Sequence, residues 1–333
     1  MLRVVALGGG TGLSTLLRGL RFHATAKLLA KHTPVDITAV VTVTDDGGSS
    51  GRLRRDFDVL APGDIRNCLV ALSEDETLMA RLFQYRFPAG RGLKGHSFGN
   101  LFLTALSNVT GDFPRAVRVS SEVLAIAGRI YPSTAANVSL EARLADGTIV
   151  RGETRIGKSR ARIEQVELQP RDPAPLEETL QAIAQADVIT MGPGSLFTSV
   201  IPNLLVDGIP EAIRRSRALK AYIVNLMWQP GETVDFSASD HVEAILRHST
   251  KGLIDVVVVN KGRISETLRR KYARQTARPV EIDAERLRAM GLRVVSAHLL
   301  EQTKKVRHDP DALARVVLEL AAEGRLRRRR LKR

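Results

Sequence analysis

Cysteine, aromatic residues and long apolar runs are all scarce in this chain of 333 residues. Its single cysteine, Cys68, cannot form an internal disulfide, which agrees with a reducing compartment, and its apolar neighbours favour a buried filler over a catalytic thiol. No run approaches the roughly 18 apolar residues of a membrane-spanning helix, and the chain enters an apolar strand without the basic lead of a signal peptide. We therefore expect a soluble, cytoplasmic protein without a transmembrane segment.

Acidic residues are also in the minority. Lysine and arginine number 50 against 36 aspartates and glutamates, and seven of the positive charges stand in residues 325–333. A block of like charges repels itself, so we expect residues 323–333 to form a basic, disordered tail. Because aromatic residues make up only 4% of the chain, there is little to stack on bases, and we expect no dedicated nucleic-acid site.

Short apolar runs rich in β-branched residues recur along the chain, with helical patterns between them. These runs are Val4–Leu7, Ile37–Val43, Val188–Met191, Ala221–Leu226, Ile254–Asn260 and Val294–Ser296. Strands buried on both faces have this composition, so the pattern predicts an α/β protein with a Rossmann-like, mostly parallel sheet and helices on both faces. We expect residues 1–310 to form this one domain.

Two segments of that domain depart from strict strand–helix alternation. Residues 65–128 have helical spacing of their apolar positions throughout. Residues 137–169 alternate apolar and polar side chains instead, with a turn at Asp146-Gly147, which is typical of an antiparallel hairpin. We expect a small antiparallel β insert at about residues 135–170.

Two glycine turns follow predicted strands and precede predicted helices. The first contains Gly9, Gly10, Thr11 and Gly12, and the second contains Gly192, Gly194 and Ser195. Glycines without a Cβ let backbone N–H groups approach an anion, and a helix N-terminus favours the same charge. The first turn has Leu13 where a dinucleotide fingerprint needs glycine, and it lacks the lysine of a P-loop. We expect a phosphate cradle of non-standard type; the alternative is a turn that only packs a helix on a sheet.

A third loop, Thr44–Arg52, joins two adjacent carboxylates to glycines, hydroxyls and arginines. Asp45 and Asp46 are candidate Mg²⁺ ligands, while Gly47, Ser49 and Arg52 are candidates for phosphate oxygens. The alternative is a turn whose aspartates cap backbone N–H groups, and no third metal ligand is visible.

Further candidates are polar side chains near strand ends or glycines, namely Asp64, Asn67, His96, Asn100, Asn225, Gln229 and Thr233. Asp64 precedes an apolar helix and by itself favours an N-cap. His96 and Asn100 stand four residues apart, which predicts one face of a helix. Asp240 has the position of a cap for a helix that starts at His241. Ser195 is not a convincing nucleophile, because the G-x-S-x-G pattern is absent and no base is spaced to serve it.

Taken together, these motifs resemble the bacterial gluconeogenesis factor family of the CofD-like superfamily. The resemblance covers nearly all of residues 1–310 and depends on the glycine turns, the Asp45–Arg52 block, Pro62–Asn67, His96–Asn100 and Arg307–Asp309. It implies a cytoplasmic regulator of cell shape and cell-wall morphogenesis under gluconeogenic growth. It also implies binding of a UDP-sugar such as UDP-N-acetylglucosamine, with contacts from the glycine turns, Asp45, Tyr272 and Arg307.

The same resemblance includes a sister branch of 2-phospho-L-lactate transferases, which use Mg²⁺ held by acidic residues and a nucleotide diphosphate donor. Two hypotheses follow. The first is a nucleotide-sugar-binding regulator that needs no cofactor, acts through a protein partner in cell-wall synthesis and is compatible with a homo-oligomer. The second is a Mg²⁺-dependent transferase with Asp45 and Asp46 on the metal, an activity that would rest on fold-level analogy alone. A dinucleotide-dependent redox enzyme is disfavoured, because no acidic ribose anchor lies nearer than Asp36.

Overall fold

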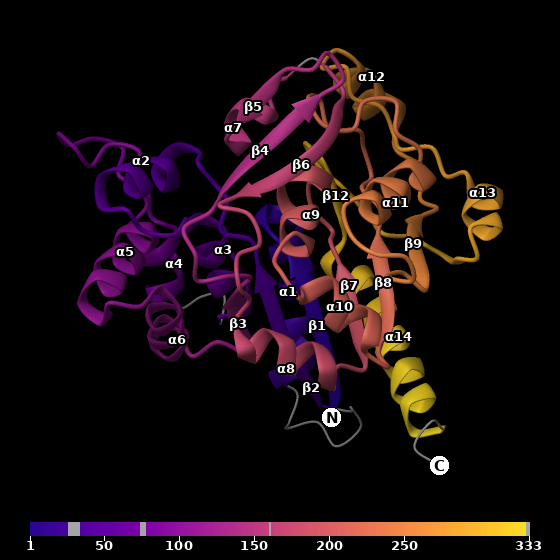
Figure 1. Cartoon of the computed structure of the whole chain (residues 1–333), viewed down its shortest axis with the longest axis horizontal. Coiled ribbons are helices and arrows are strands. Elements are labelled where there is room, and N and C mark those ends of the chain that lie inside the picture. The colour runs from indigo at the N-terminus through magenta and orange to yellow at the C-terminus, as the bar shows by residue number, and fades with distance from the viewer. Residues whose placement is uncertain (26–33, 74–77, 160, 331–333) are drawn as a thin grey trace.

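The computed structural model describes residues 1–25, 34–73, 78–159 and 161–330. A seven-stranded parallel sheet in the order β10-β9-β8-β7-β1-β2-β3 forms its centre (Figure 1). The strands are β1 (Leu2–Gly8), β2 (Val35–Val41), β3 (Arg129–Pro132), β7 (Val188–Met191), β8 (Leu219–Ile223), β9 (Val256–Asn260) and β10 (Arg293–Ala297). Nearly every residue of β1, β7 and β8 is buried, as expected for strands covered on both faces.

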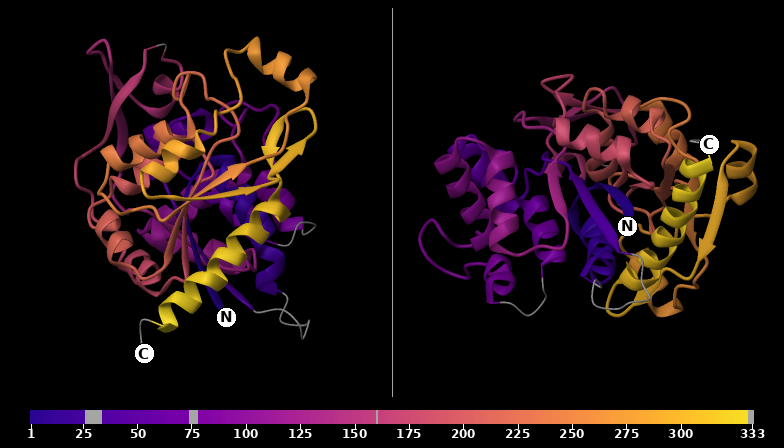
Figure 2. Two further views of the ribbon diagram at one scale, coloured as in Figure 1. Left: turned by 90° about the vertical axis from the view of Figure 1, so that its right-hand side faces the viewer. Right: turned by 90° about the horizontal axis from the view of Figure 1, so that it is seen from below.

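Helices cover both faces of this sheet. On one face α1 (Gly10–Thr25) packs against α14 (Pro310–Arg330), and on the other α8 (Glu177–Gln185) packs against α10 (Ile209–Arg215) (Figure 2). The remaining helices of this half are η2 (Leu196–Val200), α9 (Ile201–Leu204), α11 (Ala238–Arg247), α12 (Glu266–Ala273) and α13 (Ala284–Ala289). The predicted Rossmann-like α/β fold is therefore confirmed.

The helical segment and the β insert are both present. The former contains α2 (Gly48–Phe57), α3 (Gly63–Leu72), α4 (Leu78–Gln84), α5 (Phe98–Thr110) and α6 (Phe113–Val123). The insert is an antiparallel sheet in the order β5-β4-β6 (Ile149–Arg151, Ser139–Leu144, Ile163–Gln169) with the short helix α7 (Glu153–Ile156). A hairpin of β11 (Leu300–Gln302) and β12 (Val306–His308) follows β10.

The strand order reverses between β1 and β7, which are hydrogen-bonded neighbours. After β1 the chain continues to β2 on one side of this pair, and after β7 it continues to β8 on the opposite side. The two connections therefore run in opposite directions. Ligands of open α/β sheets bind at such a point, outside the carboxyl ends of the strands. The two glycine turns follow these two strands.

The prediction of a disordered tail at residues 323–333 is wrong for the residues that the structure describes there, because α14 continues to Arg330. Gly324 packs so closely on Asp187 that a Cβ would lie 1.9 Å from its carbonyl oxygen. Arg325 donates to Met1 O at 2.9 Å, and Arg328 donates to Ala186 O at 3.3 Å. These contacts with residues just before β1 and β7 hold the helix in place despite the repulsion among the arginines.

No single helix in the described part of the chain combines the length and apolar composition needed to cross a membrane. One bent pair, 196–204 with α10 at 75°, passes that test by length and composition only.

Candidate functional site

The two glycine turns lie against each other at the carboxyl ends of β1 and β7. A Cβ on Gly12 would lie 2.4 Å from Pro193 O, so no larger residue fits between the turns. Asn203, fully buried, donates from Nδ2 to Gly8 O at 3.1 Å and to Ser199 O at 2.7 Å. One side chain thus links the end of β1 to η2, the segments next to the two turns.

A cavity of about 470 Å³ opens beside these turns. Ten of the predicted site residues line it, namely Gly9, Gly10, Thr11, Gly12, Gly194, Ser195, Asn225, Gln229, Tyr272 and Arg307. They come from five separate regions of the chain. The volume falls within the range of about 300–1,000 Å³ typical of small-molecule sites. Here we call this cavity the glycine cleft.

A chain of side-chain amides forms one wall of the glycine cleft. Asn225 donates to Gln229 Oε1 at 2.9 Å, and Gln229 Nε2 donates to Ser195 Oγ at 2.6 Å. Thr233 lies outside the cavity lining but accepts from Gln229 N through its Oγ1 at 3.0 Å. The loop after β8 is therefore fastened to the second glycine turn.

The opposite wall comes from the C-terminal part of the chain. The Tyr272 hydroxyl on α12 accepts a hydrogen bond from Val306 N at 3.1 Å, which places Arg307 of β12 beside the tyrosine. His308 is buried next to Arg307, and burial lowers its pKa to about 4, so its imidazole is neutral at physiological pH. The wall thus presents an aromatic ring and one guanidinium.

Asp64 lies at the edge of the first glycine turn and is not the N-cap of α3, so the prediction of that role is wrong. The N-cap of α3 is Pro62, and the Asp64 carboxylate instead accepts a hydrogen bond from Gly10 N. A Cβ on Gly9 would lie 2.5 Å from Asp64 Oδ2. Burial first and then the nearby Asp45 carboxylate raise the pKa of Asp64 to about 7.

The adjacent carboxylates of Asp45 and Asp46 point to different partners. Asp45 Oδ1 accepts from Gly47 N at 2.8 Å, whereas Asp46 Oδ1 accepts from the N and Oγ1 atoms of Thr154 at 2.8 and 2.6 Å. The geometry does not support Mg²⁺ held between Asp45 and Asp46, because Asp46 caps the short helix of the β insert. Within the described ranges no group of three or more potential ligand side chains is arranged around one metal position.

His96 and Asn100 do not share a helix face as predicted, because α5 begins at Phe98 with Ser97 as its N-cap. His96 Nδ1 lies 3.0 Å from Ser49 Oγ, and Asn100 Nδ2 donates to Ser50 Oγ at 3.3 Å. Both therefore hold the start of α2, which follows the Asp45 loop, and neither lines the glycine cleft.

Three more predicted site residues, Arg52, Asn67 and Gly192, also lie outside the cavity lining. Arg52 donates to Lys94 O at 3.0 Å, and Asn67 Oδ1 accepts from Arg66 Nη2 at 2.7 Å. Gly192 precedes Pro193 at the end of β7 and supplies the positive φ of 80° that its turn requires. Arg54 was missed: its guanidinium donates to Thr44 O at 3.2 Å and so supports the Asp45 loop.

Two glutamates near the glycine cleft were also missed by sequence reasoning. Glu232 lines the cavity, accepts from Phe197 N at 3.2 Å and from Thr198 Oγ1 at 3.3 Å, and has its pKa raised to about 7, chiefly by burial. Burial also raises the pKa of Glu153 well above its usual range, with further contributions from Asp64 and Asp45. A glutamate inside a Pro-Gly loop was the available signal for Glu232; for Glu153 there was none.

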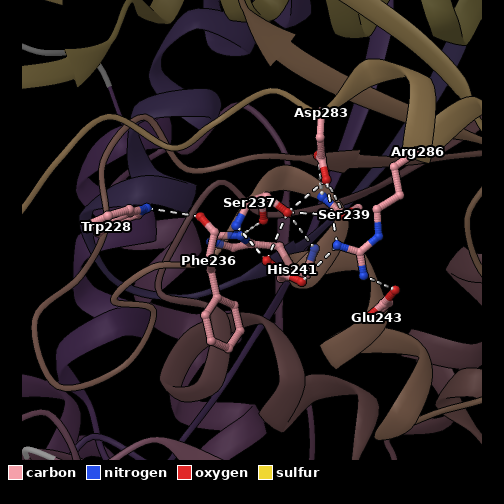
Figure 3. A network of polar contacts seen from close by, with 9 residues as sticks. Trp228, Phe236, Ser237, Ser239, His241, Glu243, Asp283 and Arg286 are labelled. Carbon is pink, nitrogen blue, oxygen red and sulfur yellow. Dashed lines mark hydrogen bonds and ion pairs between the residues drawn. The ribbon is translucent and has the colours of Figure 1, made fainter.

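A polar network fixes the segment that follows the Gln229 loop (Figure 3). The Trp228 indole donates to Phe236 O at 3.0 Å, and Ser237 with Asp240 forms a capping box at the start of α11. Asp240 therefore stands at the third helical position and is not the N-cap, since the helix begins at Ala238 rather than His241. Asp283 and Arg286 of the α13 region complete the network through Ser239 and Asp240.

Comparison with known proteins gives consistent results. The family model described as 2-phospho-L-lactate transferase CofD matches residues 4–300. The chain is 50% identical over 317 residues to a gluconeogenesis factor of Halalkalibacterium halodurans, covering 95% of both chains. It is 48% identical over 322 residues to the gluconeogenesis factor of Bacillus subtilis, covering 96% of this chain and 98% of that one. A crystal structure of a UPF0052-family protein from Bacillus halodurans has a TM-score of 0.90 and 48% identity, covering 95% of this chain and 99% of that one.

Proposed function

This chain belongs to the CofD family and, within it, to the gluconeogenesis factors, and from that membership we propose that it is a cytoplasmic regulatory protein that binds a nucleotide sugar of the UDP-N-acetylglucosamine type. The observation that supports this proposal is the glycine cleft itself. Backbone amides from two turns, an arginine and a tyrosine border one cavity of about 470 Å³.

The diphosphate is assigned to the glycine turns and Arg307. Gly9 to Gly12 lie at the start of α1, whose N-terminus carries positive partial charge. Gly10 N already donates to Asp64, so the N–H groups of Thr11 and Gly12 are the donors assigned to the diphosphate. Gly194 and Ser195 supply a second backbone and a hydroxyl from the facing turn. Arg307 adds a full positive charge and two parallel donors that suit phosphate oxygens.

The base and the sugar are assigned to the remaining walls. Tyr272 is half-buried, with its hydroxyl engaged by Val306 N, so a ring face is suited to stack on uracil. The side-chain amides of Asn225 and Gln229 both donate and accept, which suits the hydroxyl and acetamido groups of a sugar. Ligand contacts on both sides of the cleft would favour a closed arrangement and so change the surface offered to a protein partner in cell-wall synthesis.

Isothermal titration calorimetry with UDP-N-acetylglucosamine tests the proposal, with GDP and NAD as competitors. We expect binding by the wild type and a loss of at least about tenfold in affinity for Arg307→Gln, because a charge-assisted hydrogen bond is removed. Arg315→Gln, on the exposed side of α14, is the matched control and should bind normally. Absence of heat with millimolar ligand and folded protein would refute this function.

A Mg²⁺-dependent transferase is the second candidate, favoured by the transferase family model and by the facing carboxylates of Asp45 and Asp64 beside Gly10. Mg²⁺ commonly takes one or two carboxylates together with substrate phosphates, so these two residues would hold it, and the ion would neutralise diphosphate charge. This candidate predicts Mg²⁺-dependent release of nucleoside monophosphate from a nucleoside diphosphate donor. Asp45→Asn should abolish that release while the protein remains folded.

A further inference from the structure

A second cavity lies at the opposite edge of the central sheet from the glycine cleft. Its volume is about 310 Å³, and its lining includes Arg3, Asp187, Arg325, Arg328 and Arg329. Arg3 stands at the amino end of β1, five residues before Gly8, which corresponds to about 16 Å of extended strand. We call this cavity the arginine cavity; it shares no lining residue with the glycine cleft.

Contacts with residues just before β1 and β7 hold two of these arginines in place. Arg325 donates to Met1 O at 2.9 Å. Arg328 donates to the carbonyl oxygens of Gln185 and Ala186 and lies 3.7 Å from a carboxylate oxygen of Asp187. Less freedom is then lost when such guanidinium groups bind a ligand, because their positions are already restricted.

The charge in the arginine cavity is not balanced. Four arginines and one carboxylate line it; the carboxylate, Asp187, is 5% exposed and already accepts from Arg3 N at 3.0 Å. Arg3 also lines a neighbouring cavity that contains Asp36 and Glu178. The side chains of Arg3 and Arg329 have no hydrogen bond or ion pair to any other residue that the structure describes. Their donors are therefore available to a ligand.

We propose that the arginine cavity binds a compact phosphate group with at least two negative charges. Guanidinium forks match phosphate oxygens in geometry, and several of them around one cavity suit a multiply charged anion better than a single carboxylate. The lining contains no aromatic side chain to stack on a nucleobase, which disfavours single-stranded nucleic acid. The phosphate would belong either to a soluble metabolite or to a lipid headgroup.

Titration of the full chain with inorganic pyrophosphate tests the proposal. Because the glycine cleft is itself expected to bind diphosphate, the wild type is compared with Arg3→Gln/Arg329→Gln and with Arg307→Gln. We expect the double variant to lose one binding event, with at least about tenfold weaker affinity, while Arg307→Gln keeps it. UDP-sugar binding by the double variant should be unchanged, so failure of this site is distinguishable from failure of the proposed function.

The matched control removes the same charge elsewhere. Arg288 on α13 and Arg315 on α14 are exposed, and Arg315 lies about 15 Å along the helix from Arg325. Arg288→Gln/Arg315→Gln should therefore bind pyrophosphate like the wild type. Arg329→Gln alone keeps the test valid if the change at Arg3 lowers stability, since Arg329 is exposed at the end of α14.

Co-sedimentation with phosphatidylglycerol and phosphatidylcholine vesicles separates the two phosphate sources. Pyrophosphate binding that only the arginine-cavity variants lose supports a soluble phosphate. Vesicle binding with the same dependence, without pyrophosphate binding, supports a headgroup. The proposal is overturned if the double variant behaves like the control in both assays.

Discussion

Replacing Asp64 by asparagine is expected to stabilise the protein at neutral and alkaline pH. The residue is 8% exposed, and burial together with Asp45 raises the pKa of its carboxyl group from an ordinary 3.8 to about 7. Asparagine keeps an oxygen that can accept the hydrogen bond from Gly10 N. Its amide can also donate toward Asp45, so a repulsive contact would become a favourable one.

The sign and the size follow from the difference in pKa between the folded and unfolded chains. Below about pH 4 Asp64 is protonated in both states and contributes nothing to the pH dependence of stability. Between about pH 4 and 7 the unfolded chain ionises first, so the free energy of unfolding falls as pH rises. Above pH 7 the full penalty is present, at most about 4 kcal/mol from a difference of about 3 pKa units.

Urea unfolding of wild type and Asp64→Asn at several pH values measures this penalty. We expect the variant to gain about 2–4 kcal/mol relative to wild type at pH 8 and to show no comparable gain at pH 4. Asp56→Asn, an exposed substitution on α2 with the same change of charge, is the control and should show no such pH-dependent gain. A difference between Asp64→Asn and wild type that is the same at pH 4 and pH 8 would refute the reasoning.

Three further predictions concern the glycine cleft. Gly12→Ala should lower the free energy of unfolding in urea by about 1–3 kcal/mol and weaken UDP-sugar binding, because the new Cβ would lie 2.4 Å from Pro193 O. Gly8→Ala is the control: its Cβ would lie 3.4 Å from the nearest atom, so it should change stability by less than about 0.5 kcal/mol. Asn203→Ala should cost about 2 kcal/mol because it removes two buried hydrogen bonds, although Gly8 O keeps the one from Thr42 N. A cost below about 0.5 kcal/mol in the same assay would contradict this role. Glu232→Gln should stabilise the protein above pH 7 but not below about pH 4, because burial raises the pKa of the Glu232 carboxyl group to about 7. If the free energies of unfolding of the variant and the wild type changed in parallel with pH, that cause would be wrong.

Patterns of apolar residues along the chain predicted the helices and strands well, because these elements depend on the periodicity of neighbouring side chains. The apolar run Val4–Leu7 became the buried β1, and the alternation after residue 137 became an antiparallel insert. Strand limits shifted slightly, as for β2, which ends at Val41 rather than Val43, since hydrogen bonding to neighbours decides where a strand stops. The contact between the glycine turns followed from topology, because adjacent parallel strands end at the same edge.

What the sequence by itself determined is the α/β class, the glycine turns and the resemblance to one family, since each depends on residues close together in the chain or on motifs in a fixed order. Tertiary structure alone decided the partner of each carboxylate. Asp64 contacts Gly10, and Asp46 turns to Thr154 of the insert, because these contacts depend on how distant segments pack. The same holds for the basic C-terminus: its charges predicted disorder, but backbone carbonyl oxygens at the amino edge of the sheet bind the arginines and extend the helix to Arg330.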